Sequence, residues 1–540
     1  MTATWHKFLT ATLGGVTLLT ASAFPSLAAE PAVVVSVKSF NELLTDSQYL
    51  GNAVQQPLLG AALPGAITQI TGGKGLKGLD ATKPIGAYLT MTSEGQPKDF
   101  VIFVPVVSQK TFAESLASIL PDPTTENGFT QYQIPNNPVP VFAKHGAKHF
   151  LFAQSTDALK ETPNLDTLVK STADIAIEFD LTKISDGLKE QFLAQTEAQA
   201  AATASNNITA SEAERRGEEL GRAIALSGLR RLLMDGDRLS VGFNIDAKAK
   251  AVSLDLGFTA KSETTLAQAC AGYAKTESPF TSLTSKQTIG SFVLSTPLSQ
   301  DAQGIFRLMV DEGEKGGVAA VKADTSVKEA DRKAAIEVLT RAAGTLRQSI
   351  ERGRLDQALI VNSGASGKLQ LLAATKVVKG KELGKIFEEV IRKDPKSSPV
   401  KLGVTEVKGA RVHAITLPPD SDREKHLGNG PAHLAFAEDA VVLTAGDDSL
   451  TAVKSSLDAK TTTSTKRAPI SLRIGLSKLL PLMEDAGPQV LELGKSAFES
   501  GHDEIALEVA SQPNGASMRI EIQEGVLRLI GLVGAARTGQ

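Results

Sequence analysis

The chain has 540 residues, of which 42% are hydrophobic and 22% are charged, and its formal net charge is −3. This composition excludes a disordered chain, because it supplies enough apolar surface to bury a core. It also excludes a disulfide scaffold, because there is only one cysteine. The near-neutral charge argues against a dedicated nucleic-acid binder, whose surface would be strongly basic. A chain of this length predicts roughly two to four domains.

Residues 1–28 have the pattern of a secretory signal peptide. Lys7 provides a short positive region, residues 8–24 are apolar, and Ser26-Leu27-Ala28 places small residues before a cleavage site after Ala28 or Ala29. The alternative is an uncleaved anchor, which the short apolar run disfavours, and no later stretch approaches the length of a membrane-spanning helix. We therefore expect an exported mature protein, periplasmic or extracellular, without a transmembrane segment.

The single cysteine, Cys270, lies in an apolar helical pattern. No intrachain disulfide can form from one cysteine, so the pattern predicts a buried small hydrophobic residue. The alternative is a reactive or intermolecular thiol.

An internal repeat is the main feature of the sequence. Residues 86–119 align without a gap with residues 357–390, and both blocks read as two strands followed by the start of a helix. Later strand-like blocks also recur in the same order. Chance alignment of alternating strands is the alternative, but the shared order of strands and helices disfavours it. The sequence therefore predicts two similar units, at 33–283 and 290–536.

Two helical segments interrupt the repeat. Unit 1 has extra residues at about 190–235, where two helical patterns predict a projecting hairpin. In unit 2, a capping box at Ser326 and Glu329 opens an amphipathic helix that runs to Ile350, with Gly353 as its expected stop.

The strand patterns predict an α+β fold. Alternating segments such as Ile175–Leu181 have one apolar and one polar face, which is typical of antiparallel sheets. Tight spacings such as Ala437–Ala440 predict hairpins. Strands that pair without an intervening helix argue against a doubly wound parallel sheet. We expect each unit to be a curved antiparallel sheet with helices packed on one face.

Histidines and glycines provide three candidate motifs. Residues 73–78 match GxGxxG, but a helix precedes them and a strand follows, the reverse of a dinucleotide-binding turn, so a loop is expected. His145 and His149 have the spacing of two metal ligands on a helix, yet Gly146 and the flanking residues predict a strand–turn–strand. His413 and His433 could face each other on neighbouring strands, without an evident third ligand.

Other motifs are incomplete. Asp420–Glu424 begins like a calcium loop but lacks its later glycine and acidic residue, so a solvated loop is expected. Ser398–Lys401 matches SxxK without the partner motifs of the enzymes that use it. The sequence thus predicts no catalytic, cofactor-binding or metal-binding residues and no cofactor.

Through its signal segment and the repeated blocks at 86–119 and 357–390, the sequence resembles uncharacterised exported bacterial proteins made of duplicated α+β units. The resemblance implies no activity or site. The leading hypothesis is a non-catalytic envelope or secreted protein that binds an unknown protein or small ligand, and no nucleic acid. The alternatives are a carrier of an apolar ligand such as a lipid, and a hydrolase whose site the sequence does not reveal. Partner identity and oligomeric state stay open.

Overall fold

The computed structural model describes residues 30–538, apart from short gaps at 72, 74, 93, 117–122, 134–138, 205–211, 275, 277–278, 281–282, 286, 324–327, 365, 394–398, 459–467 and 481–486. The predicted signal peptide, residues 1–28, lies outside the described residues. The chain divides into two compact units. Unit 1 contains Pro57–Asn244 and the segment that ends at Asn52, and unit 2 contains Ala53–Gln56 and Ile245–Gln540.

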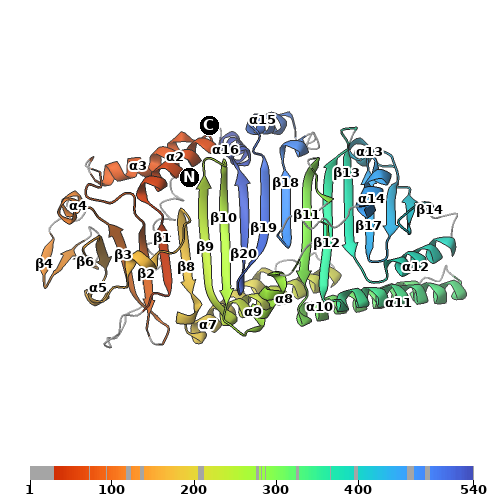
Figure 1. Ribbon diagram of the computed structural model, residues 1–540, viewed down its shortest axis with the longest axis horizontal. Helices are drawn as coiled ribbons and strands as arrows, with labels where there is room; N and C mark the ends of the chain where they lie inside the picture. Colours follow the sequence, from red (N-terminus) through yellow and green to blue (C-terminus); the bar gives the residue numbers. More distant parts are fainter. Residues whose placement is uncertain are drawn as a thin grey trace. The chain divides into compact units, whose positions relative to one another are not determined.

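Unit 1 is built around an antiparallel sheet with the strand order β9-β8-β1-β2-β3-β7-β6-β5-β4 (Figure 1). Its strands are β1 (Val33–Val37), β2 (Ile85–Met91), β3 (Pro97–Pro105), β4 (Thr124–Glu126), β5 (Phe129–Tyr132), β6 (Val141–His145), β7 (His149–Ala153), β8 (Ile175–Asp180) and β9 (Gly236–Asp246). Its helices are α2 (Phe40–Ala53), α3 (Pro57–Ile70), α4 (Gln109–Leu116), α5 (Asp157–Lys160), α6 (Leu165–Leu168), the short 3-10 helix η1 (Leu181–Lys183), α7 (Asp186–Ala204) and α8 (Glu212–Asp235).

Unit 2 has the order β10-β20-β19-β18-β11-β12-β13-β17-β16-β15-β14, again with antiparallel neighbours. Its strands are β10 (Ala251–Ala260), β11 (Thr288–Pro297), β12 (Arg354–Ser363), β13 (Leu369–Lys376), β14 (Val400–Val407), β15 (Ala410–Ile415), β16 (Ala432–Phe436), β17 (Ala440–Gly446), β18 (Ile470–Gly475), β19 (Glu504–Gln512) and β20 (Gly515–Gln523). Its helices are α9 (Thr265–Ala274), α10 (Gln300–Ala323), α11 (Glu329–Glu351), α12 (Gly380–Lys393), α13 (Ser421–His426), α14 (Ser449–Asp458), α15 (Pro488–Phe498) and α16 (Glu524–Thr538).

The predicted α+β class is confirmed by this mixture of helices with antiparallel strands. The compact units are not coextensive with the predicted repeats 33–283 and 290–536. Strand β10 belongs to unit 2 by its contacts, because all of its central residues pair with β20. Among the described residues, no helix combines the length and the apolar character needed to cross a membrane.

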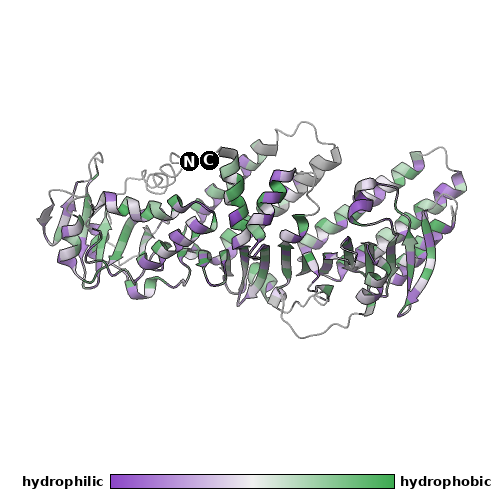
Figure 2. Ribbon diagram, turned by 90° about the horizontal axis from the view of Figure 1, so that it is seen from above, coloured by the Kyte–Doolittle hydropathy of each residue, from purple (hydrophilic) through white to green (hydrophobic). Residues whose placement is uncertain are grey.

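The expectation that helices pack on one face of each sheet is wrong. In unit 2, Val412 packs in a core with Val453 of α14, whereas the next residue, His413, contacts Phe387 of α12. Successive residues of a strand point to opposite faces, so α12 and α14 cover opposite faces of the outer strands. Figure 2 shows that the helices carry hydrophobic and hydrophilic residues together, as expected for helices that pack on a sheet.

Unit 1 has the same arrangement around β3 and β7. Phe150 packs with Phe112 of α4, whereas Leu151 packs with Leu159 of α5. The uninterrupted apolar run Phe150–Ala153 is the signal that the sequence offered, since a strand buried on both faces does not alternate.

Several local predictions are confirmed. The turn 437–440 joins the paired strands β16 and β17. Helix α11 stops before Gly353, whose φ of 72° is the left-handed conformation that glycine adopts without strain. The residue that precedes α11 is Lys328, and the predicted cap, Ser326, lies outside the described residues. Helices α7 and α8 occupy the segment where a helical hairpin was expected, and Arg230 of α8 bonds both carboxylate oxygens of Glu190 in α7.

Candidate functional site

A pocket of about 480 Å³ opens on one face of the unit 2 sheet, over strands β11, β18 and β19. Its lining is predominantly polar. The lining residues are Thr284, Ser285, Thr288, Ile289, Ser291, Val293, Ala468, Ser471, Arg473, Gly475, Lys478, Asp503, Glu504 and Glu508.

The strand register explains why these side chains meet. Ser291 of β11 pairs with Arg473 of β18, and Ser471 of β18 pairs with Glu508 of β19. Paired residues of antiparallel strands share a face, and alternate residues along each strand return to it. The polar residues of β18 and β19, together with Ser291 and the flanking Ile289 and Val293 of β11, therefore form the floor of the pocket.

Arg473 forms ion pairs with two glutamates of β19, the strand that makes up one wall of the pocket. One terminal nitrogen donates to Glu504 Oε1 at 3.0 Å and the other donates to Glu508 Oε1 at 2.5 Å. The hydrogen bond to Glu508 is the main reason why the pKa of Arg473 is raised. These bonds turn the guanidinium towards β19 and away from Ser291 on the other side.

Ser291 lies in the floor of the pocket, and its hydroxyl has no hydrogen-bond partner among the described residues. The residue is only 6% exposed. Its hydroxyl oxygen is not one of the fully buried, unpartnered side-chain atoms of the described residues, so it is accessible from the pocket. A group of this kind inside a pocket is suited to bind a ligand that completes its hydrogen bonds.

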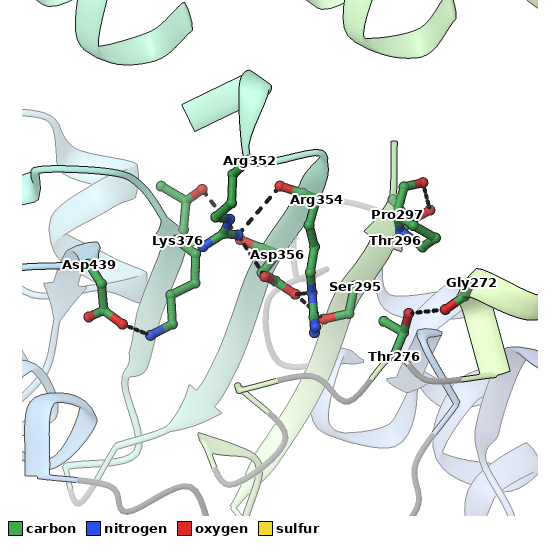
Figure 3. Close-up of polar contacts among 11 residues, drawn as sticks. Gly272, Thr276, Ser295, Thr296, Pro297, Arg352, Arg354, Asp356, Lys376 and Asp439 are labelled. Carbon is green, nitrogen blue, oxygen red and sulfur yellow. Dashed lines mark hydrogen bonds and ion pairs between the residues drawn. The ribbon is translucent and has the colours of Figure 1, made fainter. Parts of the chain in front are cut away.

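A second polar cluster lies at the end of β11 and is already saturated. Asp356 is 3% exposed, and its carboxylate accepts hydrogen bonds from Ser295 Oγ, Arg354 Nε and Arg352, each at 2.8 Å. Figure 3 shows these side chains converging on Asp356, with the ion pair of Lys376 and Asp439 beside them. Because all of its partners come from the chain itself, we interpret this cluster as structural.

No protein family, curated protein or solved structure matches this chain.

The turn histidines lie where the sequence predicted them. His145 ends β6 and His149 begins β7, so the strand–turn–strand reading is confirmed and the helical spacing of two metal ligands does not apply. Burial lowers the pKa of both imidazoles. Among the described residues, no group of three or more His, Cys, Asp or Glu side chains is placed to hold a metal ion.

The hypothesis that His413 and His433 face each other is wrong. His413 pairs with Leu434, so His433 points to the opposite face of the sheet. His413 Nδ1 accepts the Gly403 N–H at 3.2 Å, and its Nε2 lies 3.8 Å from Glu388 Oε1. His433 Nδ1 lies 2.9 Å from Ser449 Oγ on the other side. Burial lowers the pKa of each histidine.

The remaining sequence motifs have structural roles. Gly73, Gly75 and Gly78 adopt positive φ angles in the loop after α3, as expected for a loop.

The predicted solvated loop at Asp420–Glu424 is instead the start of α13, because the Asp420 carboxylate caps that helix by accepting the Arg423 N–H. Lys401 of the SxxK match lies in β14, and Ser398 lies outside the described residues. Cys270 is buried, as predicted, and burial raises the pKa of its thiol.

Asp46 of α2 is a buried carboxylate without a hydrogen bond among the described residues. It is 9% exposed, and burial, together with the nearby Asp174 and Glu42, raises its pKa to about 6. At neutral pH the fold therefore holds a charged carboxylate in a place that favours the protonated form.

We expect Asp46→Asn to stabilise the protein at pH 7.5 by about 1–3 kcal/mol, since a shift of one pKa unit corresponds to about 1.4 kcal/mol. The folded pKa is raised, so the favourable contribution of wild-type Asp46 is complete below pH 4 and is lost as the pH rises through about 6. Urea unfolding from pH 4 to 8 should show the gap between variant and wild type opening over that interval. A gap that does not change with pH would contradict the assignment.

Proposed function

We propose that this chain is an exported, non-catalytic binding protein and that the pocket of unit 2 is its site for a small polar ligand. The observation that carries the proposal is Ser291, a buried residue whose hydroxyl lines the pocket without a hydrogen-bond partner among the described residues. The volume of the pocket falls within the range of small-molecule sites, about 300–1,000 Å³.

The test is binding of the ligand that copurifies with the native protein, compared between two glycine variants. A side chain at Gly475 enters the pocket, with its first carbon 3.5 Å from Asp503 Oδ2, an ordinary contact. Gly290 precedes Ser291 on β11 and faces the other side of the sheet, 3.7 Å from the Arg473 carbonyl oxygen. We expect Gly475→Val to abolish binding of the ligand and Gly290→Val to preserve it, as measured by native mass spectrometry.

Equal binding by both glycine variants would overturn the assignment of the pocket. A native protein that carries no small polar ligand, and that binds none from a panel of cations, anions and polyols, would overturn the binding function itself.

Export is proposed from the signal-peptide pattern of residues 1–28. We expect the native protein to be recovered outside the cytoplasm with its N-terminus at residue 29 or 30. N-terminal sequencing of the fractionated protein measures both, and an intact Met1 in the cytoplasmic fraction would contradict export.

We also propose that the two halves of the chain arose by duplication. The strand orders of the two units support this. Each strand of unit 1 from β1 to β9 corresponds to the strand of unit 2 numbered ten higher, from β11 to β19, and corresponding strands have corresponding neighbours. The opposed pairs α4 and α5 in unit 1, and α12 and α14 in unit 2, occupy corresponding places between the strands.

An apolar-ligand carrier is the second candidate, favoured by the other face of the unit 2 sheet. Leu359 of β12 and Leu443 of β17 are 51% and 40% exposed, and both pair with Ala373, which lies between them. Exposed apolar side chains in such a row are typical of surfaces that bind other apolar groups. Solvent extraction of the native protein followed by mass spectrometry should release a lipid in stoichiometric amount if this candidate is correct, and lipid-free protein would exclude it.

A further inference from the structure

We infer that the pocket of unit 2 selects a small aliphatic organic cation, one that carries ammonium or guanidinium groups. This inference rests on the proposed function and adds the chemical class of the ligand.

The charges of the lining favour a cation. Among the described residues that line the pocket, three carboxylates, from Asp503, Glu504 and Glu508, face two cationic side chains, Arg473 and Lys478. Both terminal nitrogens of Arg473 already donate hydrogen bonds to the two glutamates. The wall formed by β19 therefore keeps a net negative charge, and a positively charged ligand gains the most from it.

The hydrogen-bonding groups that remain are mostly acceptors. Each glutamate bonds Arg473 through Oε1 only, and no hydrogen bond to Oε2 of either residue exists among the described residues. Asp503 similarly uses Oδ2, which accepts the Ser477 N–H at 2.7 Å. Because Arg473 leans towards β19, the space above Ser291 stays accessible to a ligand that donates to its hydroxyl and to the carboxylates. Ammonium and guanidinium groups are donors without acceptors.

The lining also limits the shape of the ligand. None of the described residues that line the pocket is aromatic, so they offer no planar ring for stacking. The apolar part of the floor comes from Ile289 and Val293, which suit a short methylene chain between polar ends.

Three four-carbon probes of different charge test the inference on the full mature chain. Isothermal titration calorimetry would compare 1,4-diaminobutane with neutral 1,4-butanediol and anionic succinate, and agmatine would add a guanidinium group. We expect the two cations to bind, more weakly at higher ionic strength, and the diol and succinate to give no measurable heat.

Glu508→Gln locates the interaction. It removes one charge from the pocket, and we expect it to weaken cation binding about tenfold or more, because hydrogen bonds to charged groups are the stronger ones. The matched control is Asp255→Asn, which breaks the ion pair with Arg519 on the same sheet at a residue that does not line the pocket. We expect the affinity of this control for 1,4-diaminobutane to equal that of the wild type.

The outcomes separate this inference from the proposed function. Binding of succinate or the diol that Gly475→Val abolishes would overturn the cation class and leave the binding function standing. Failure of both cations to bind the wild type would overturn the inference, and so would equal losses in Glu508→Gln and Asp255→Asn.

Discussion

Replacing Asp356 by alanine is expected to lower the free energy of unfolding by about 2–4 kcal/mol, as measured by urea denaturation at pH 7. The side chain of Asp356 is 4% exposed, and its removal leaves Ser295, which is fully buried, without its 2.8 Å hydrogen bond. The loss is smaller than for a fully buried ion pair because Arg352 and Arg354 are about one-third exposed, at 31% and 33%, and water can solvate them.

Asp439→Asn is the control for this effect. Asp439 pairs with Lys376, but its side chain is 65% exposed, so the bond is screened by solvent. We expect a change of less than about 0.5 kcal/mol. Equal effects of the two substitutions would mean that the carboxylate of Asp356 is solvated and does not close the cluster seen in Figure 3.

The second large effect is expected in the unit 2 core. Ile360 of β12 is fully buried and packs with Leu372, Val442 and Val453. Its replacement by alanine leaves a cavity between the sheet and α14, and such truncations cost about 2–5 kcal/mol. The same urea titration measures the loss.

The neighbouring residue supplies a matched control. Leu359 is 51% exposed on the opposite face of the same strand, so Leu359→Ala should cost less than about 1 kcal/mol. A large loss at Leu359 would show that this face is covered, and it would remove the support for the apolar-ligand candidate.

Local patterns in the sequence predicted many of the elements correctly. The alternation in Ile175–Leu181 identified strand β8, because side chains of a strand point to its two faces in turn. The short spacing at 437–440 predicted a hairpin because few residues separate the two strands. The expectation that helices cover only one face of each sheet failed at β7, because the apolar run Phe150–Ala153 does not alternate and is buried on both faces of the sheet.

Local patterns in the sequence did not predict the candidate site. Arg473 lies 31 residues before Glu504 and 35 before Glu508, and the sequence marks each of them only as the polar member of an alternating strand. Their neighbours across the sheet depend on strand order and register, which no local pattern contains. The wrong prediction that His413 and His433 face each other has the same cause, since a one-residue difference in register decides whether two side chains share a face.

The sequence by itself determined the α+β class, the antiparallel character of the strands and the turns at 145–149 and 437–440, because these depend on periodicities within a few residues. Only the tertiary structure decided which strands are neighbours, that helices cover both faces, and that a buried serine meets an Arg–Glu wall in a pocket. The physical reason is that pairing across a sheet joins distant segments through main-chain hydrogen bonds, in which every residue type can accept and every type except proline can donate.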